Sequence, residues 1–316
     1  MLNNNLFILT GPTGSGKTNI SIEIFQYIPE VEIVSADSMQ IYKEMNIGTD
    51  KPSLDILTKV PHHCIDIVEP DVDFNVAQYA QTALKEIENI LISNKKPFIV
   101  GGTGLYIKSF IKPLFLGPGR DYNIRQQLEK ILQDKGNDFL FEQLKKFDYK
   151  YSLKINPNDL KRLIRALEVF HLTGKPFSSF HNKEEIYTKY KYSIICLSMD
   201  RNKLYERINQ RVDLMIRDGL IEETNYILKK YNCEHSNSMQ GLGYKQISLF
   251  LKGKIKKEEA VEKIKKETRN FAKRQISWFK NQIPVDHYID VDDFENNSQC
   301  AKYIAKIMLE RGCNNC

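Results

Sequence analysis

The chain has 316 residues, of which 41% are hydrophobic and 27% are charged, and its net charge is +6. These values are ordinary for a globular protein with one large domain and a smaller one. No apolar run reaches membrane-spanning length, and the N-terminus lacks the regions of a signal peptide, so we expect a cytoplasmic protein with no membrane partner. The six cysteines are scattered, which predicts reduced thiols rather than a disulfide framework.

A glycine-rich stretch near the N-terminus is the strongest signal. Gly11-Pro-Thr-Gly-Ser-Gly-Lys-Thr18 follows an apolar run at residues 6–9 and precedes isoleucines at positions 20, 24 and 28. Strand, loop and helix in this order, with the full G-x-x-x-x-G-K-[ST] spacing, predict a loop that binds a di- or triphosphate. Thr18 is in the position that touches a magnesium ion. The candidate phosphate ligands are Gly11, Pro12, Thr13, Gly14, Ser15, Gly16, Lys17 and Thr18.

Strand and helix patterns then alternate. Strand-type runs occur at residues 31–34, 64–68 and 97–100, and residues 74–92 have a helical stripe of apolar positions. This alternation predicts an α/β fold with a parallel sheet flanked by helices, in which ligands lie at the carboxyl ends of the strands. Asp37 and Thr103 each follow one of these strands. We therefore expect both to share a cleft with the glycine-rich loop.

The middle of the chain reads as helical. Pro and Gly interrupt residues 112–120, and helical patterns without clear strands follow to about residue 188. Asn156-Pro-Asn-Asp159 is typical of a helix start, and Gly174 with Pro176 is typical of its end. We predict an α-helical insertion at 117–190, an α/β core at 1–116 and 191–295, and a C-terminal tail at 296–316.

Strand character returns at residues 192–198, and a helix is predicted at 204–212, where Arg207 and Arg211 lie one turn apart. A Gly-containing turn at 240–245 precedes a basic helix that ends near residue 279. The excess of Lys and Arg between residues 252 and 280 is compatible with an RNA backbone as partner, although a solvated helix face explains it as well.

The loop alone leaves the chemistry open. A P-loop NTPase carries an acid at the end of a second strand, but the run at 97–100 ends in Gly-Gly-Thr-Gly. Asp37 can serve instead as a magnesium ligand or as the base of a small-molecule kinase. The adjoining Ser38, Gln40 and Tyr42 can hydrogen-bond or stack on a nucleobase.

A series of motifs resolves this ambiguity. The chain resembles the bacterial tRNA dimethylallyltransferase family in its glycine-rich loop and in Ser35-Ala-Asp-Ser-Met-Gln-Ile-Tyr42, Met45-Asn-Ile-Gly-Thr-Asp-Lys-Pro52 and Val100-Gly-Gly-Thr-Gly-Leu-Tyr106. Further matches lie at residues 61–67, 156–170, 207–211, 243–246 and 268–278. Together they extend in family order from about position 7 to 280.

The resemblance implies a P-loop kinase-like α/β domain with a helical insertion that grips the anticodon stem-loop. It also implies transfer of the dimethylallyl group of dimethylallyl diphosphate to N6 of adenine 37, 3′ of the anticodon, in tRNAs that read codons beginning with U. Asp37 would be the base, Thr103 would contact the target nucleotide, and Arg211 would clamp a diphosphate assisted by Mg²⁺, with Arg207 as a further ligand. A monomer is expected. The implied RNA-binding residues are Asp37, Ser38, Met39, Gln40, Thr103, Arg125, Lys161, Arg162, Leu163, Ile164, Arg165, Gln240, Gly241, Leu242, Gly243, Tyr244 and Lys245.

Two rival hypotheses are a P-loop small-molecule kinase, which would bind ATP, and a non-catalytic RNA-binding protein that uses nucleotide as a switch. Two groups of possible metal ligands are not interpreted as metal sites. His62 and His63 beside Cys64 are interpreted as structural, and Cys313 with Cys316 is a lone C-x-x-C without a second ligand pair.

Overall fold

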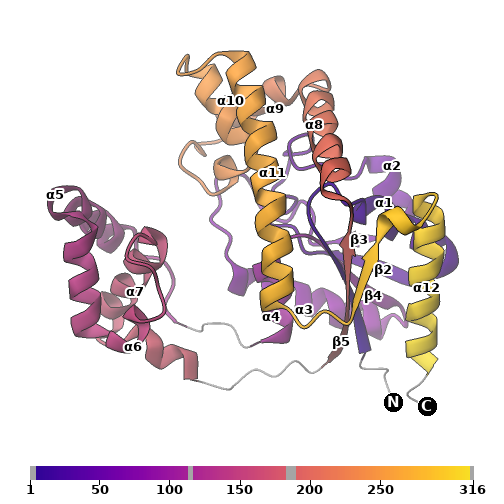
Figure 1. Ribbon diagram of the computed structural model, residues 1–316, viewed down its shortest axis with the longest axis horizontal. Helices are drawn as coiled ribbons and strands as arrows, with labels where there is room; N and C mark the ends of the chain where they lie inside the picture. Colours follow the sequence, from indigo (N-terminus) through magenta and orange to yellow (C-terminus); the bar gives the residue numbers. More distant parts are fainter. Residues whose placement is uncertain (1–4, 113–116, 183–189, 314–316) are drawn as a thin grey trace. The chain divides into compact units, whose positions relative to one another are not determined.

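The computed structural model describes residues 5–112, 117–182 and 190–313 (Figure 1). The chain divides into two compact units, one formed by Met1–Ile111 and Thr188–Cys316 and the other by Lys112–Tyr187. The boundaries that the sequence predicts, at 116/117 and 190/191, lie a few residues from these divisions and beside undescribed segments. None of the described helices is both long and apolar enough to cross a membrane.

The first unit is built on a parallel sheet. Within the described residues it has six strands in the order β3-β2-β4-β1-β5-β6, and every pair is parallel. The predicted α/β fold with a parallel sheet flanked by helices is confirmed. The strands are β1 (Asn5–Thr10), β2 (Val31–Ser35), β3 (His62–His63), β4 (Lys96–Val100), β5 (Lys191–Ser198) and β6 (His287–Asp290).

Helices cover both faces of this sheet because successive strand residues point to opposite sides. Leu6 and Ile8 of β1 pack in one core with α3, α4 and the α9–α11 helices, whereas Phe7 and Leu9 pack in a second core with α1 and α12. The helices of this unit are α1 (Lys17–Tyr27), α2 (Leu54–Lys59), α3 (Val76–Ile92), α4 (Gly104–Ile111), α8 (Arg201–Arg217), α9 (Leu220–Lys230), α10 (Tyr244–Leu251), α11 (Lys257–Gln282) and α12 (Asn297–Cys313), with short 3₁₀ turns at Ser238–Gln240 and Val291–Asp293.

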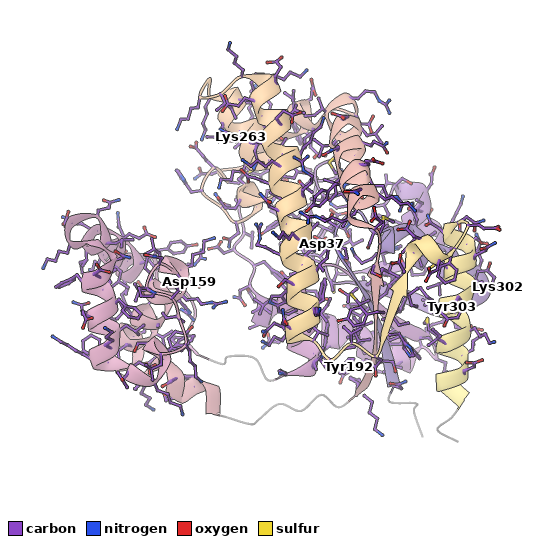
Figure 2. The ribbon with its side chains drawn as sticks, viewed as in Figure 1. Asp37, Asp159, Tyr192, Lys263, Lys302 and Tyr303 are labelled. Atoms are coloured by element: carbon purple, nitrogen blue, oxygen red, sulfur yellow. The ribbon has the colours of Figure 1, made fainter. Side chains whose placement is uncertain are left out.

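Two predictions for this unit are wrong. The run at 64–68 is not a strand: Cys64 and Asp66 have φ of 62° and 54°, and Val68 makes only an isolated bridge with Tyr42. The predicted tail at 296–316 is wrong for its described part, since α12 packs along α1 (Figure 1). Its buried positions are Cys300, Ala301, Ile304, Ala305 and Met308, whereas Lys302 and Tyr303 point to solvent (Figure 2).

The second unit is helical and has its own core. The predicted helix start is confirmed, because the Asp159 side chain accepts a hydrogen bond from Arg162 N, and Gly174 ends the helix with φ of 67°. The core includes Leu128, Leu140, Leu144, Leu163 and Leu167. The elements are α5 (Tyr122–Phe147), with a break at Gly136, α6 (Tyr149–Ser152), α7 (Leu160–Thr173) and a 3₁₀ helix at Phe177–Asn182.

Candidate active site

The glycine-rich loop joins β1 to α1 and has the backbone of an anion cradle. Gly11, Gly14 and Gly16 have φ of 146°, 86° and 89°, in the region that side-chain-bearing residues rarely adopt. Gly16 is the N-cap of α1, and no side chain caps the helix. The first N–H groups of α1, together with the positive end of its dipole, are therefore available to an anion.

Lys17 provides a half-buried cation at this loop. Its Nζ donates to Gly11 O at 2.9 Å and to Pro12 O at 2.8 Å. Burial lowers the pKa of Lys17 to about 8, and the nearby Asp37 carboxylate only partly offsets this effect. An anion bound in the loop would stabilise the charged form and can draw the ammonium away from these two carbonyls.

Arg211 of α8 lies across from the loop. Its guanidinium donates to the Thr13 hydroxyl at 2.6 Å and pairs with Asp50 at 3.1 Å. Among the described residues, no group bonds two buried polar atoms, Arg211 Nε at the cavity and Ser15 Oγ in the glycine-rich loop. Unpaired buried polar atoms are costly, so a donor-rich pocket of this kind favours an acceptor-rich ligand such as a diphosphate.

Asp37 and Thr103 follow neighbouring strands and lie together. Asp37 Oδ1 accepts from Met39 N at 2.8 Å, and among the described residues no group bonds its Oδ2. Thr103 Oγ1 accepts from Ser38 N at 3.0 Å and donates to Ser38 Oγ at 3.2 Å. The carboxylate is thus held in one orientation beside a hydroxyl that is fixed by the same loop.

Gln275 is a site residue that sequence reasoning missed, although it lies inside the matched motif at 268–278. Its Oε1 accepts from Thr13 N at 2.8 Å, and its Nε2 donates to Gly102 O at 2.7 Å. The side chain is only 6% exposed. Helix α11 therefore ties the glycine-rich loop to the loop that carries Thr103.

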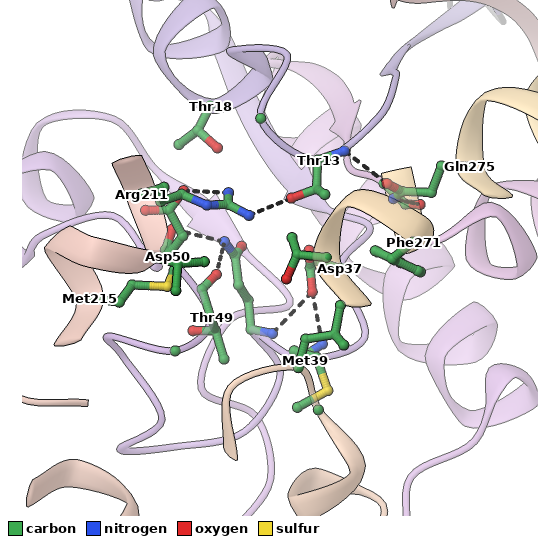
Figure 3. A pocket seen from close by; sticks show the side chains of 18 of the residues that line it. Thr13, Thr18, Asp37, Met39, Thr49, Asp50, Arg211, Met215, Phe271 and Gln275 are labelled. Carbon is green, nitrogen blue, oxygen red and sulfur yellow. Dashed lines mark hydrogen bonds and ion pairs between the residues drawn. The ribbon is translucent and has the colours of Figure 1, made fainter. Parts of the chain in front are cut away.

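These groups line one cavity of about 700 Å³ (Figure 3). Figure 3 shows Arg211 bonded to Thr13 and Asp50, and Asp37 bonded to Met39. The predicted site residues in its lining are Thr13, Gly14, Gly16, Lys17, Thr18, Asp37, Ser38, Met39, Gln40, Thr103, Arg207, Arg211, Gln240, Gly241, Leu242 and Lys245. The structure therefore brings the predicted phosphate loop, Asp37 and Thr103 into one space.

Comparison with known proteins agrees with this arrangement. The model of the IPP transferase family matches residues 40–282. The chain belongs to the IPP transferase family. The resemblance seen in its motifs is thereby confirmed.

Curated relatives of this family member match over most of their length. The chain is similar to the tRNA dimethylallyltransferases of Halothermothrix orenii (44% identity, 90% of this chain, 88% of the relative) and Natranaerobius thermophilus (44%, 96% and 92%). Among solved structures, it resembles a tRNA isopentenylpyrophosphate transferase from Bacillus halodurans (35% identity, TM-score 0.72, 98% of this chain, 97% of the other). It also resembles a eukaryotic dimethylallyltransferase described as acting on tRNA (28%, 0.78, 97% and 80%).

The 240–245 turn of this IPP transferase is only partly accessible. Gln240 and Lys245 are exposed, but Tyr244 is 0% exposed and its hydroxyl donates to Glu223 at 2.6 Å. Gly243 and Tyr244 do not line the cavity. The Tyr244 side chain is therefore not accessible to RNA in this conformation, and the implied contact at this position stays a prediction.

The residues of the helical unit with implied RNA contacts also differ in their accessibility. The Leu163 and Ile164 side chains are buried in its core. Arg125 and Arg165 both bind the fully buried Glu168, at 2.9 Å and 2.7 Å. Burial raises the pKa of Glu168, but hydrogen bonds from the two guanidinium groups outweigh it and hold that pKa below its usual value.

Arg125 is thus engaged in an ion pair with Glu168, and its expected role at the RNA stays a prediction. Lys161 and Arg162, in the first turn of α7, are exposed.

The residues considered as metal ligands contact other protein groups or lie in part outside the described residues. His62 Nδ1 lies 2.7 Å from Val60 O, and the two ring nitrogens of His63 contact Glu86 and Glu32. Within residues 5–112, 117–182 and 190–313, no group of three His, Cys, Asp or Glu side chains could hold a metal ion. Cys316, and with it the C-terminal pair, lies outside the described residues.

Proposed function

We propose that this chain transfers the dimethylallyl group from dimethylallyl diphosphate to N6 of adenine 37 in tRNAs that read codons beginning with U, giving N6-(dimethylallyl)adenosine. The observation that carries the proposal is the single cavity in which a phosphate loop faces Asp37 and Thr103, in a chain that belongs to the IPP transferase family. The small-molecule kinase alternative explains the loop but not this family membership.

The loop and Arg211 would bind the diphosphate and stabilise it as a leaving group. In the reaction, the bond between the allylic carbon and the diphosphate oxygen breaks, and negative charge develops on that oxygen. Lys17, Thr18 and Arg211 line this space, and Arg211 is held there by Thr13 and Asp50. Because Arg211 and the first N–H groups of α1 are fixed before the reaction, they stabilise the charge without reorganisation, whereas Lys17 would first leave its two carbonyl partners.

Asp37 would act on the nucleophile. Its Oδ1 is held by Met39 N, so Oδ2 is available to accept a hydrogen bond from the adenine N6–H. As N6 forms its bond to the allylic carbon, this oxygen accepts the proton, and the exocyclic amine does not accumulate positive charge. Thr103, fixed against Ser38, would orient the target nucleotide beside it.

Mg²⁺ is expected with the diphosphate. The loop fits this hard cation, because the Thr18 hydroxyl is an oxygen ligand that lines the same cavity. Thr18 would hold the ion directly. When bound, the ion neutralises charge on the diphosphate.

The RNA would enter with its target base flipped out of the anticodon loop, since a stacked adenine cannot reach a buried diphosphate. Gln240 and Lys245 are exposed at the cavity and would contact the backbone there. Lys161 and Arg162 are exposed on the helical unit and would grip the stem. We propose that the protein acts as a monomer in the cytoplasm, where its tRNA substrates are found.

The direct test is incubation with dimethylallyl diphosphate, Mg²⁺ and unmodified tRNA, followed by nucleoside mass analysis. We expect one dimethylallyladenosine per tRNA, and Asp37→Ala should lower turnover by about 10²–10⁴-fold while tRNA affinity changes little. Near-normal turnover of Asp37→Ala would refute the role of the base. Transfer of a γ-phosphoryl group from ATP to a small acceptor, without modified nucleoside, would support the kinase instead.

A further inference from the structure

Beside the cavity, the carboxylate of Glu223 binds several groups of the protein, and Glu223 belongs to none of the matched motifs. Glu223, in the first turn of α9, accepts hydrogen bonds from Asn46 N at 2.9 Å, Ile47 N at 2.9 Å and Gly48 N at 3.2 Å. The Tyr244 hydroxyl donates to the same carboxylate at 2.6 Å. One internal anion therefore organises three consecutive backbone N–H groups in a nest.

The loop that Glu223 holds, residues 46–50, reaches the phosphate site directly. Gly48, Thr49 and Asp50 line the cavity, and Asp50 pairs with Arg211 at 3.1 Å. Gly48 packs so closely on the Tyr244 ring that an added Cβ would lie 2.5 Å from it. The position of Asp50, and with it the orientation of Arg211, thus depends on a loop that is fixed from α9 and α10.

The far side of the loop is also fixed. Lys51, whose side chain is 2% exposed, donates to Tyr42 O at 2.9 Å and to Asp66 at 2.6 Å. Gln40 Nε2 donates to Thr49 O and to Asp50 O, both at 3.3 Å. Lys51 also donates to Asn46 Oδ1 at 3.1 Å. Among the described residues, Glu223 is the side chain that binds the backbone N–H groups of residues 46–48.

We propose that Glu223 is a positioning residue that holds Arg211 in its diphosphate-binding orientation through the loop 46–50 and Asp50. This inference rests on the proposed function, because it takes the diphosphate as the ligand of Arg211. Glu223 does not line the cavity, so its effect must pass through the loop.

The test measures the affinity of the full chain for inorganic pyrophosphate by calorimetry in Mg²⁺, with and without Glu223→Gln. The isosteric amide keeps the side-chain volume but loses the charge that the three N–H groups bind. We expect pyrophosphate affinity to fall about tenfold, and tRNA affinity to change by less than about twofold. Glu222→Gln, an exposed neighbour on α9, is the matched control and should bind as the wild type does.

A double-mutant cycle separates positioning from general destabilisation. In an Asp50→Ala background the loop no longer holds Arg211, so Glu223→Gln should weaken pyrophosphate binding by less than about twofold. Equal losses in both backgrounds, or an equal loss of tRNA affinity, would overturn the proposal. Should Glu223→Gln unfold, Tyr244→Phe removes one donor to the carboxylate and must show the same dependence on Asp50.

Pyrophosphate binding without any prenyl transfer would refute the proposed function but not this inference.

Discussion

Replacing Gln275 by leucine should uncouple the two loops of the active site. Leucine has nearly the same volume but makes neither of the hydrogen bonds to Thr13 N and Gly102 O. The Gly102 carbonyl would remain buried without a partner, at about 1–3 kcal/mol, and loss of the bond to the partly accessible Thr13 N–H adds about 1 kcal/mol. We therefore expect the free energy of unfolding to fall by about 2–4 kcal/mol.

Urea unfolding measures this loss directly, provided that the slope of the transition is unchanged. Gln81→Leu is the matched control, because Gln81 is an exposed glutamine in the middle of α3 and should change stability by less than about 0.5 kcal/mol. Pyrophosphate affinity of Gln275→Leu should fall as well, since Thr13 is no longer fixed. A loss of stability no larger than that of Gln81→Leu would refute the reasoning.

Three further predictions concern the same site. Arg211→Lys keeps the charge but loses the planar fork, so the KM for dimethylallyl diphosphate should rise about tenfold in steady-state kinetics; an unchanged KM would contradict the clamp. Pyrophosphate affinity should fall as pH rises through about 8, where Lys17 loses its proton. Pyrophosphate itself titrates in this range, so the affinity of Lys17→Met is measured at each pH and subtracted as the control. The pKa of Lys17 is lower in the folded protein than in the unfolded chain, so the free energy of unfolding of the free protein should rise between pH 8 and the ordinary lysine pKa. If the difference in pyrophosphate affinity between wild type and Lys17→Met did not change with pH, the titration of Lys17 would be contradicted. Gly101→Val should not fold stably, as judged by thermal unfolding, because its Cβ would lie 2.2 Å from the Ala36 carbonyl oxygen.

Local patterns predicted much of the fold because they are sufficient for it. The alternation of Leu6 and Ile8 with Phe7 and Leu9 requires a strand covered on both faces, and both faces are covered. Asp159 and Gly174 bound a helix by their own hydrogen bond and backbone conformation. The sequence of α12 also contains a helical pattern, since Cys300, Ile304 and Met308 recur every fourth residue.

The features that local patterns did not predict depend on contacts between residues that are distant in the sequence. The apolar run at 64–68 has strand-like composition, but Asp66 takes a positive φ and binds Lys51, so the run anchors a loop instead. Gln275 contacts Thr13 across 262 positions, and no local pattern encodes that distance. Glu223 is similar: its role comes from the fold that brings α9 against the 46–48 backbone.

The carboxylates in the cavity lining support the proposal that Asp37 is the base. Within the described residues the lining contains Asp37, Asp50 and Glu267. Asp50 is neutralised by Arg211, and Glu267 accepts a hydrogen bond from Gln246 at 2.7 Å. Only Asp37 combines an oxygen fixed by a backbone N–H with a second oxygen that no described residue bonds. A proton acceptor needs both a fixed direction and a vacant lone pair, and this carboxylate has them beside the phosphate loop.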